Sequence, residues 1–216
     1  KQLSPFATLI KKEFISISRE PSYLFSYFAI ATTMPIMVYC CYTLFESLIK
    51  STVGLDITFA LAILIILIFS VLTNTFCSTN ITRDGLTNLK IKVIPVEPSK
   101  ILLAKVVFCV FVSSISVILS SVLLIAATSL SFGEGMFCAL VGIIFSMTQV
   151  FIATRIDLNR AKISSSPSEV EAASSKIIAK VVFLGLLVAL VIGILSVIIT
   201  ILSNGSNIDA IQKLNL

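Results

Sequence analysis

Long apolar stretches alternate with short polar ones along this chain, and the apolar stretches define its architecture. Five of them are long enough to cross a hydrocarbon core of about 30 Å, which takes about 20 helical residues. They cover residues 23–48, 57–77, 101–130, 136–154 and 177–202. Their apolar positions are continuous rather than alternating, which favours helices over barrel strands. We therefore expect an all-α, polytopic helical membrane protein with a single transmembrane domain over residues 1–216.

Residues 5–20, before the first predicted span, have an amphipathic pattern. Phe6, Leu9, Ile10, Phe14 and Ile17 fall at helical spacing, and the charged residues of the stretch fall elsewhere. We expect a helix that lies in the membrane interface before the chain enters the first span. The alternative is a cytoplasmic extension of that span.

Composition supports the membrane interpretation and removes most enzyme classes. Hydrophobic residues make up 57% of the chain and charged residues only 12%, against about 25% charged residues in a soluble domain. The mean hydropathy is +1.08. The chain has no His, so the commonest general base and metal ligand is missing. Its five Cys form no CxxC pair, and we expect no metal site and no catalytic residue.

The distribution of Lys and Arg predicts the orientation. Of the 16 basic residues, all but Lys50 and Lys213 fall on one side of the five spans. This bias places the N-terminus and the two long loops, 78–100 and 155–176, in the cytoplasm. It also explains the net charge of +5 without nucleic acid as a partner. Five spans leave the C-terminal tail outside, so we expect a sixth span beyond Leu216 in a longer parent chain.

The two cytoplasmic loops carry the residues that we expect to act. In the first, Thr82 to Gly85 form a helix start or tight turn, and Leu86 and Leu89 begin a short apolar face. That face needs cover, either from the lipid interface or from a groove on a soluble partner. In the second loop, Arg155, Asp157 and Arg160 could form a local ion network, which contributes little at an exposed site unless a partner covers it.

At these residues the chain resembles a known family. The stretches LIKKEFISISREP, before the first span, and TRDGLTNLKIKVIPVEPSKILLAK, before the third, resemble corresponding segments of type 2 ABC exporter permeases. The matching residues are Arg83, Asp84, Gly85, Leu89, Pro95, Val96, Leu102, Ala104 and Lys105. The stretch ATRIDLNRAKISSSPSEVEAASSK further resembles a loop in large bacterial permeases whose chains carry two six-span halves, although Ala161 stands where that loop has Pro. The chain is similar to the second half.

The resemblance implies a membrane-spanning permease subunit of an ATP-driven exporter in the cell membrane. A separate cytosolic ABC ATPase would hold ATP and Mg, since this chain has no Walker A motif and we expect no cofactor in it. A second permease half or protomer would complete the transport path. The ATPase would bind a coupling helix at about residues 82–93. Its expected partner-binding residues are Thr82, Arg83, Asp84, Gly85, Leu86, Leu89 and Lys90.

Small polar residues inside the spans allow two interpretations. Ser113, Ser116 and Ser120 recur along the third span, and Asn74 lies near the end of the second. They could form a polar wall along a substrate path. Small hydroxyl residues also serve ordinary packing between membrane helices, where they bond to their own backbone carbonyls.

Two other functional classes stay open from the sequence. One is a stand-alone membrane binding or immunity protein without an ATPase, which the short predicted outer loops argue against. The other is an integral-membrane enzyme, for which Asp84, Asp157, Glu169 and Glu171 are the acidic candidates on the cytoplasmic side. These acids occupy turn and helix-start positions, so we expect a transport subunit rather than an enzyme.

Overall fold

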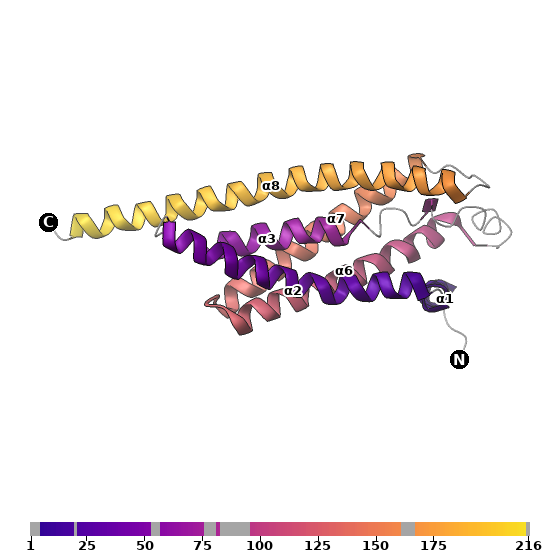
Figure 1. Cartoon of the computed structure of the whole chain (residues 1–216), viewed down its shortest axis with the longest axis horizontal. Coiled ribbons are helices and arrows are strands. Elements are labelled where there is room, and N and C mark those ends of the chain that lie inside the picture. Colours follow the sequence, from indigo (N-terminus) through magenta and orange to yellow (C-terminus); the bar gives the residue numbers. More distant parts are fainter. Residues whose placement is uncertain are drawn as a thin grey trace.

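The regular secondary structure of the protein is helical. The computed structural model describes residues 5–19, 21–52, 57–75, 81–82, 96–160 and 167–214, and no strand occurs among them. The helices are α1 (Pro5–Arg19), α2 (Pro21–Thr52), α3 (Thr58–Thr73), α6 (Pro98–Ala127), α7 (Phe132–Arg160) and α8 (Pro167–Leu214), within the residues that the structure describes. They form an elongated bundle with α1 at one end (Figure 1). The predicted all-α class is confirmed for this part of the chain.

Helix α3 lies at the centre of the bundle because it is apolar on every side. A helix without a polar face is stable only where all of its faces are covered. In α3 nine residues between Ala60 and Val71 are buried, and the helix packs against α2, α7 and α8. Figure 1 shows it between α2 and α8. The core around it includes Met34 and Val38 of α2, and Val117 of α6.

Within the described residues four helices are long and apolar enough to cross a membrane, where the sequence predicted five spans. They contain the candidate spans Thr32–Ser51, Pro98–Ala127, Phe132–Asn159 and Ser174–Ser203. The helix in the predicted span 57–77 is shorter: α3 has 16 residues, which is about 24 Å of helix. It ends at Thr73, and Asn74 follows as the C-cap residue, with its N–H bonded to the Ser70 carbonyl. These four helices therefore support a membrane location, and α3 packs among them.

The helices at the predicted cytoplasmic side extend beyond the apolar stretches. Helix α7 continues to Arg160 and α8 begins at Pro167, so most of the predicted loop 155–176 is helical. Pro98 occupies the first turn of α6, where its missing N–H costs nothing. Polar residues such as Arg and Lys are good helix formers, so a helix need not end where hydropathy falls.

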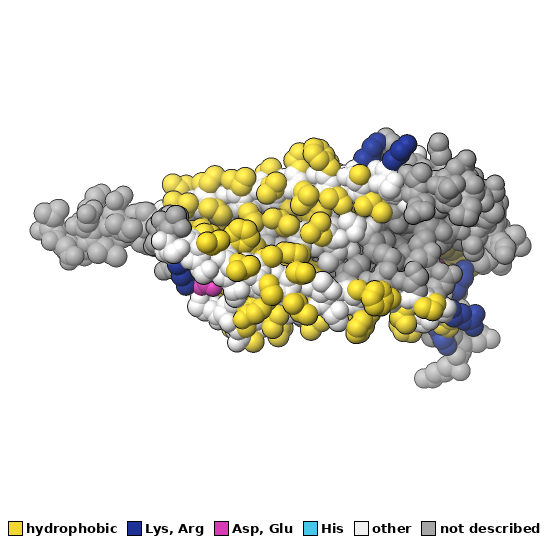
Figure 2. Space-filling view, in the orientation of Figure 1, with side chains coloured by type: hydrophobic (Ala, Val, Ile, Leu, Met, Phe, Trp, Pro, Cys, Tyr) yellow, Lys and Arg dark blue, Asp and Glu magenta, His cyan; other side chains and the backbone are white. Residues whose placement is uncertain are grey.

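The surface of the bundle separates apolar and charged side chains along its length. Exposed large hydrophobic residues occur on all four candidate spans, with Phe45, Phe111, Phe151 and Phe183 among them. On the face in Figure 2 they fill the middle, whereas Lys, Arg and Glu lie toward the two ends. An exposed apolar area of this extent is unusual on a soluble monomer and fits a lipid-facing surface.

Candidate functional site

Thr82, Arg155 and Asp157, three of the expected functional residues, lie at the end of the bundle that carries α1. This end brings together the start of α6, the end of α7 and the start of α8 (Figure 1). The described basic side chains at this end are Lys11, Lys12, Arg19, Lys100, Lys105, Arg155, Lys176 and Lys180. Lys50 lies at the opposite end, in an ion pair of 2.7 Å with Glu46. We refer to the α1 end as the basic end.

A buried carboxylate joins the two predicted cytoplasmic loops at the basic end. Asp157, in the last turns of α7, is only 1% exposed. Its Oδ2 accepts hydrogen bonds from the backbone N–H groups of Ile81 at 2.7 Å and Thr82 at 3.3 Å. Its Oδ1 accepts one from the Thr82 hydroxyl. A carboxylate that accepts two successive N–H groups holds the start of a helical segment, as an N-cap does.

The contact of Asp157 with residues 81–82 involves both predicted cytoplasmic sites. Thr82, expected to begin the coupling helix, is helical and 2% exposed. The other expected coupling residues, 83–90, lie outside the described residues. Asp157, which the sequence allowed in a local ion network with Arg155 and Arg160, is buried on α7. Arg155 is exposed and forms no ion pair with any described residue. The side chain of Arg160 is not among those that the structure describes.

Helix α1 is fixed to the start of α6 by both apolar and charged contacts. Leu9 packs with Ile101 and Ala104 in a small buried cluster. The Glu13 carboxylate lies 3.3 Å from the Lys105 ammonium, and both side chains are largely buried at 15% and 9% exposure. Lys11 and Lys12 are exposed on the opposite side of α1. The amphipathic pattern of α1 is therefore used for packing against the bundle, with a basic face left free for solvent, headgroups or a partner.

The serines of α6 do not form a polar wall along a path in this structure. The Ser113 hydroxyl donates to the Cys109 carbonyl at 3.0 Å, and the Ser120 hydroxyl donates to the Ser116 carbonyl at 2.7 Å. Ser113, Ser116 and Ser120 are all buried between helices. These contacts favour the packing interpretation of the third span.

Asn74 instead belongs to a buried polar cluster that connects α3 to α7. Its Nδ2 donates to Ser146 Oγ at 3.0 Å and to Gln149 Oε1 at 3.4 Å, and Asn74 is fully buried. The sequence interpretation missed Ser146 and Gln149. Their signal was present: Gln149 is an amide inside an otherwise apolar stretch, and such residues usually face the interior of a bundle.

The described residues hold no group of three or more His, Cys, Asp or Glu side chains placed to bind a metal ion. What they assemble at the basic end is a mechanical connection between α7 and the segment at residues 81–82, beside a docked amphipathic helix.

Comparison with family models, with curated proteins and with solved structures finds no match for this chain.

Proposed function

We propose that this chain is a membrane-spanning permease subunit of an ATP-driven exporter, with its basic end in the cytoplasm and a separate ABC ATPase bound there. The observation that carries the proposal is the Asp157 contact. It ties the start of the proposed coupling segment to a helix long and apolar enough to cross the membrane. A force applied by a soluble partner to that segment would therefore reach the membrane helices directly.

The proposed mechanism is a rigid-body movement. Closure of the ATPase would push the coupling segment, and Asp157 would pass this movement to α7, which packs against α3, α6 and α8. Packed helices shift as units rather than deform, so the push would tilt the spans and open a path to the other side. A second permease half or protomer would supply the other wall of that path.

Helix α1 has a supporting role in this proposal. Its apolar side is held on α6, and its exposed side presents Lys11, Lys12 and Arg19. A basic helix at the cytoplasmic surface is attracted to anionic headgroups, which would hold the coupling end at a fixed depth. The same face lies beside the expected position of the ATPase.

The test is co-purification of the protein from nanodiscs with any P-loop ATPase encoded next to its gene. The wild type is compared with the double variant Gly85→Pro and Leu89→Asp, which breaks the proposed coupling helix and its apolar face. Glu46→Gln, at the opposite end, is the matched control. We expect the ATPase to be captured by the wild type and the control and lost from the double variant.

Absence of any captured ATPase would refute the exporter proposal. The stand-alone membrane binding protein would then be the better account, because it needs no soluble motor. Equal capture by the wild type and the double variant would show that the ATPase binds elsewhere on the chain, which would refute the assignment of residues 82–93.

A further inference from the structure

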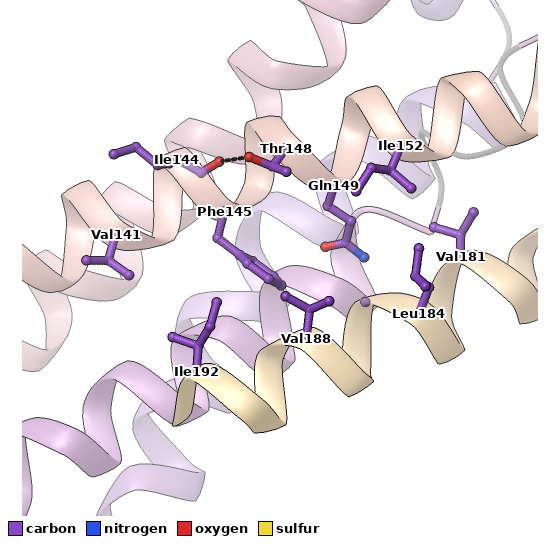
Figure 3. Close-up of a pocket in the computed structure, with 11 residues that line it drawn as sticks. Val141, Ile144, Phe145, Thr148, Gln149, Ile152, Val181, Leu184, Val188 and Ile192 are labelled. Atoms are coloured by element: carbon purple, nitrogen blue, oxygen red, sulfur yellow. Dashed lines mark hydrogen bonds between the residues drawn. The ribbon is translucent and has the colours of Figure 1, made fainter. Parts of the chain in front are cut away.

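A groove runs between α7 and α8, and no described segment of the chain fills it. It has a volume of about 280 Å³, at the lower end of the range for ligand pockets. Figure 3 shows its two walls, with Val141, Phe145 and Gln149 on α7 facing Val188 and Ile192 on α8. Its lining is apolar except for Thr148 and Gln149.

Gln149 brings an unsatisfied hydrogen-bond donor to this groove. The residue is only 4% exposed, and its Nε2 has no hydrogen-bond partner among the described residues. Its Oε1 is used by Asn74, so the amide cannot turn over without losing that bond. The nitrogen lies against Gly185 of α8, where an added Cβ would approach it to 2.5 Å. Gly185 therefore leaves room for the amide at the groove wall.

The occupant of the groove must supply an acceptor. A buried N–H without a partner costs about 1–3 kcal/mol, and a water or ligand oxygen would remove that cost. The other polar group in the lining does not supply it: the Thr148 hydroxyl donates to the Ile144 carbonyl of its own helix at 2.9 Å (Figure 3), and Gln149 Nε2 forms no hydrogen bond with it.

The order of chemical groups along α8 identifies the class of occupant. Lys176, Lys180, Leu184, Val188 and Ile192 are spaced four residues apart, so each lies next to the one before, along a line that winds slowly around the helix. The two lysines line a neighbouring hollow that shares Leu184 with the groove. Neither lysine forms an ion pair within the described ranges.

The protein therefore presents three kinds of chemical group in order along α8 and α7. The lysine ammonium groups come first, at the basic end of the bundle. The Gln149 amide follows, beside Gly185. An apolar channel then continues along α7 from Gln149 to Val141, over about 12 Å of helix. A phospholipid has the complementary order: an anionic headgroup, an ester carbonyl and an alkyl chain.

We propose that the α7/α8 face binds one anionic phospholipid, with its phosphate at Lys176 and Lys180, a carbonyl oxygen accepting from Gln149 Nε2, and an acyl chain in the groove. This inference rests on the membrane insertion in the proposed function and is independent of the ATPase. A bound lipid of this kind would connect α8 to α7 and would make their spacing sensitive to membrane composition.

The test uses delipidated protein in detergent, titrated with phosphatidylglycerol or phosphatidylcholine of identical chains, with bound lipids counted by native mass spectrometry. We expect one tight phosphatidylglycerol site, with phosphatidylcholine bound about tenfold to thirtyfold more weakly because it lacks net charge. Lys176→Gln with Lys180→Gln should remove that preference. Lys100→Gln, an exposed lysine on α6, is the matched charge control and should leave it unchanged.

The groove itself is tested by two tryptophans on the same helix. Val188→Trp fills the groove without touching the polar cluster and should reduce lipid retention more than tenfold, whereas Val191→Trp lies outside the lining and should not. Gln149→Leu should weaken both lipids about fivefold. Equal retention of the two lipids by the wild type would overturn the proposal, as would equal effects of the two tryptophans or no effect of Gln149→Leu. None of these outcomes depends on whether an ATPase is captured.

Discussion

Replacing Asp157 by Ala is the sharpest perturbation of the proposed coupling contact. The change removes the acceptor for the N–H groups of Ile81 and Thr82 and for the Thr82 hydroxyl. Thr82 is almost fully buried, so its two donors would lose their partner without regaining water. Ile81 is only half-buried, and its N–H can be solvated in part.

The expected cost follows from these three donors. A hydrogen bond to a charged group contributes about 1.5–3 kcal/mol, and contributions within one network do not add fully. With Ile81 discounted for its exposure, we expect the segment at residues 81–82 to lose about 2–4 kcal/mol of protection against local opening. Since about 1.4 kcal/mol is a factor of ten, the amides should exchange about 30-fold to 700-fold faster.

Hydrogen exchange followed by mass spectrometry measures this directly in nanodiscs. Asp157→Asn is the matched variant, because its side-chain oxygen still accepts while the charge is lost, and it should show a smaller acceleration. Peptides from the centre of α3 report global stability and should be unaffected. If the amides of Ile81 and Thr82 exchange at wild-type rates in Asp157→Ala, other contacts hold this segment and the proposed connection to α7 is wrong.

Two further predictions concern packing and use matched pairs. Gly193→Ala places a methyl group 2.6 Å from the Leu64 side chain, and this overpacking between α8 and α3 should lower the Tm in detergent by about 2–6 °C. Gly133→Ala meets nothing within 4 Å and should leave the Tm unchanged or slightly higher; equal losses would contradict the close approach of α8 to α3. Glu13→Gln removes a largely buried ion pair and should speed proteolysis within α1 several-fold, whereas Glu97→Gln, in an exposed pair on α6, should not; equal rates would show that the ion pair does not hold α1.

Hydropathy predicted the helices well because helix formation depends on local sequence. The amphipathic spacing of Leu9 and Ile17 indicated a helix over residues 5–20, and α1 covers Pro5–Arg19 with both residues buried. The sequence could not show which surface would cover this apolar face. Lipid and the start of α6 are equivalent by periodicity alone, and only the fold shows that Val106 and Cys109 lie beside Ile17.

The helix ends and the polar contacts could not be predicted from the sequence, for a different reason. Asn74 ends α3 and bonds to side chains more than 70 positions away, and Asp157 bonds to Thr82 at a similar separation. No local pattern encodes such pairs. A carboxylate two residues from an arginine suggests a local ion pair by proximity, and nothing in the local sequence indicates that Asp157 is buried. Gln149 carried a usable signal as an amide in an apolar stretch, although its missing partner is visible only in the structure.

The central claim is that the bundle crosses the membrane with its basic end in the cytoplasm, within reach of an ATPase. Single cysteines at Ser131, which is exposed beside the start of α7, and at Ser164, between α7 and α8, test it in a background without the native cysteines. A membrane-impermeant maleimide should label position 131 in intact cells and position 164 only after permeabilisation. Labelling of position 164 in intact cells would place the proposed coupling end outside the cell and would contradict the account.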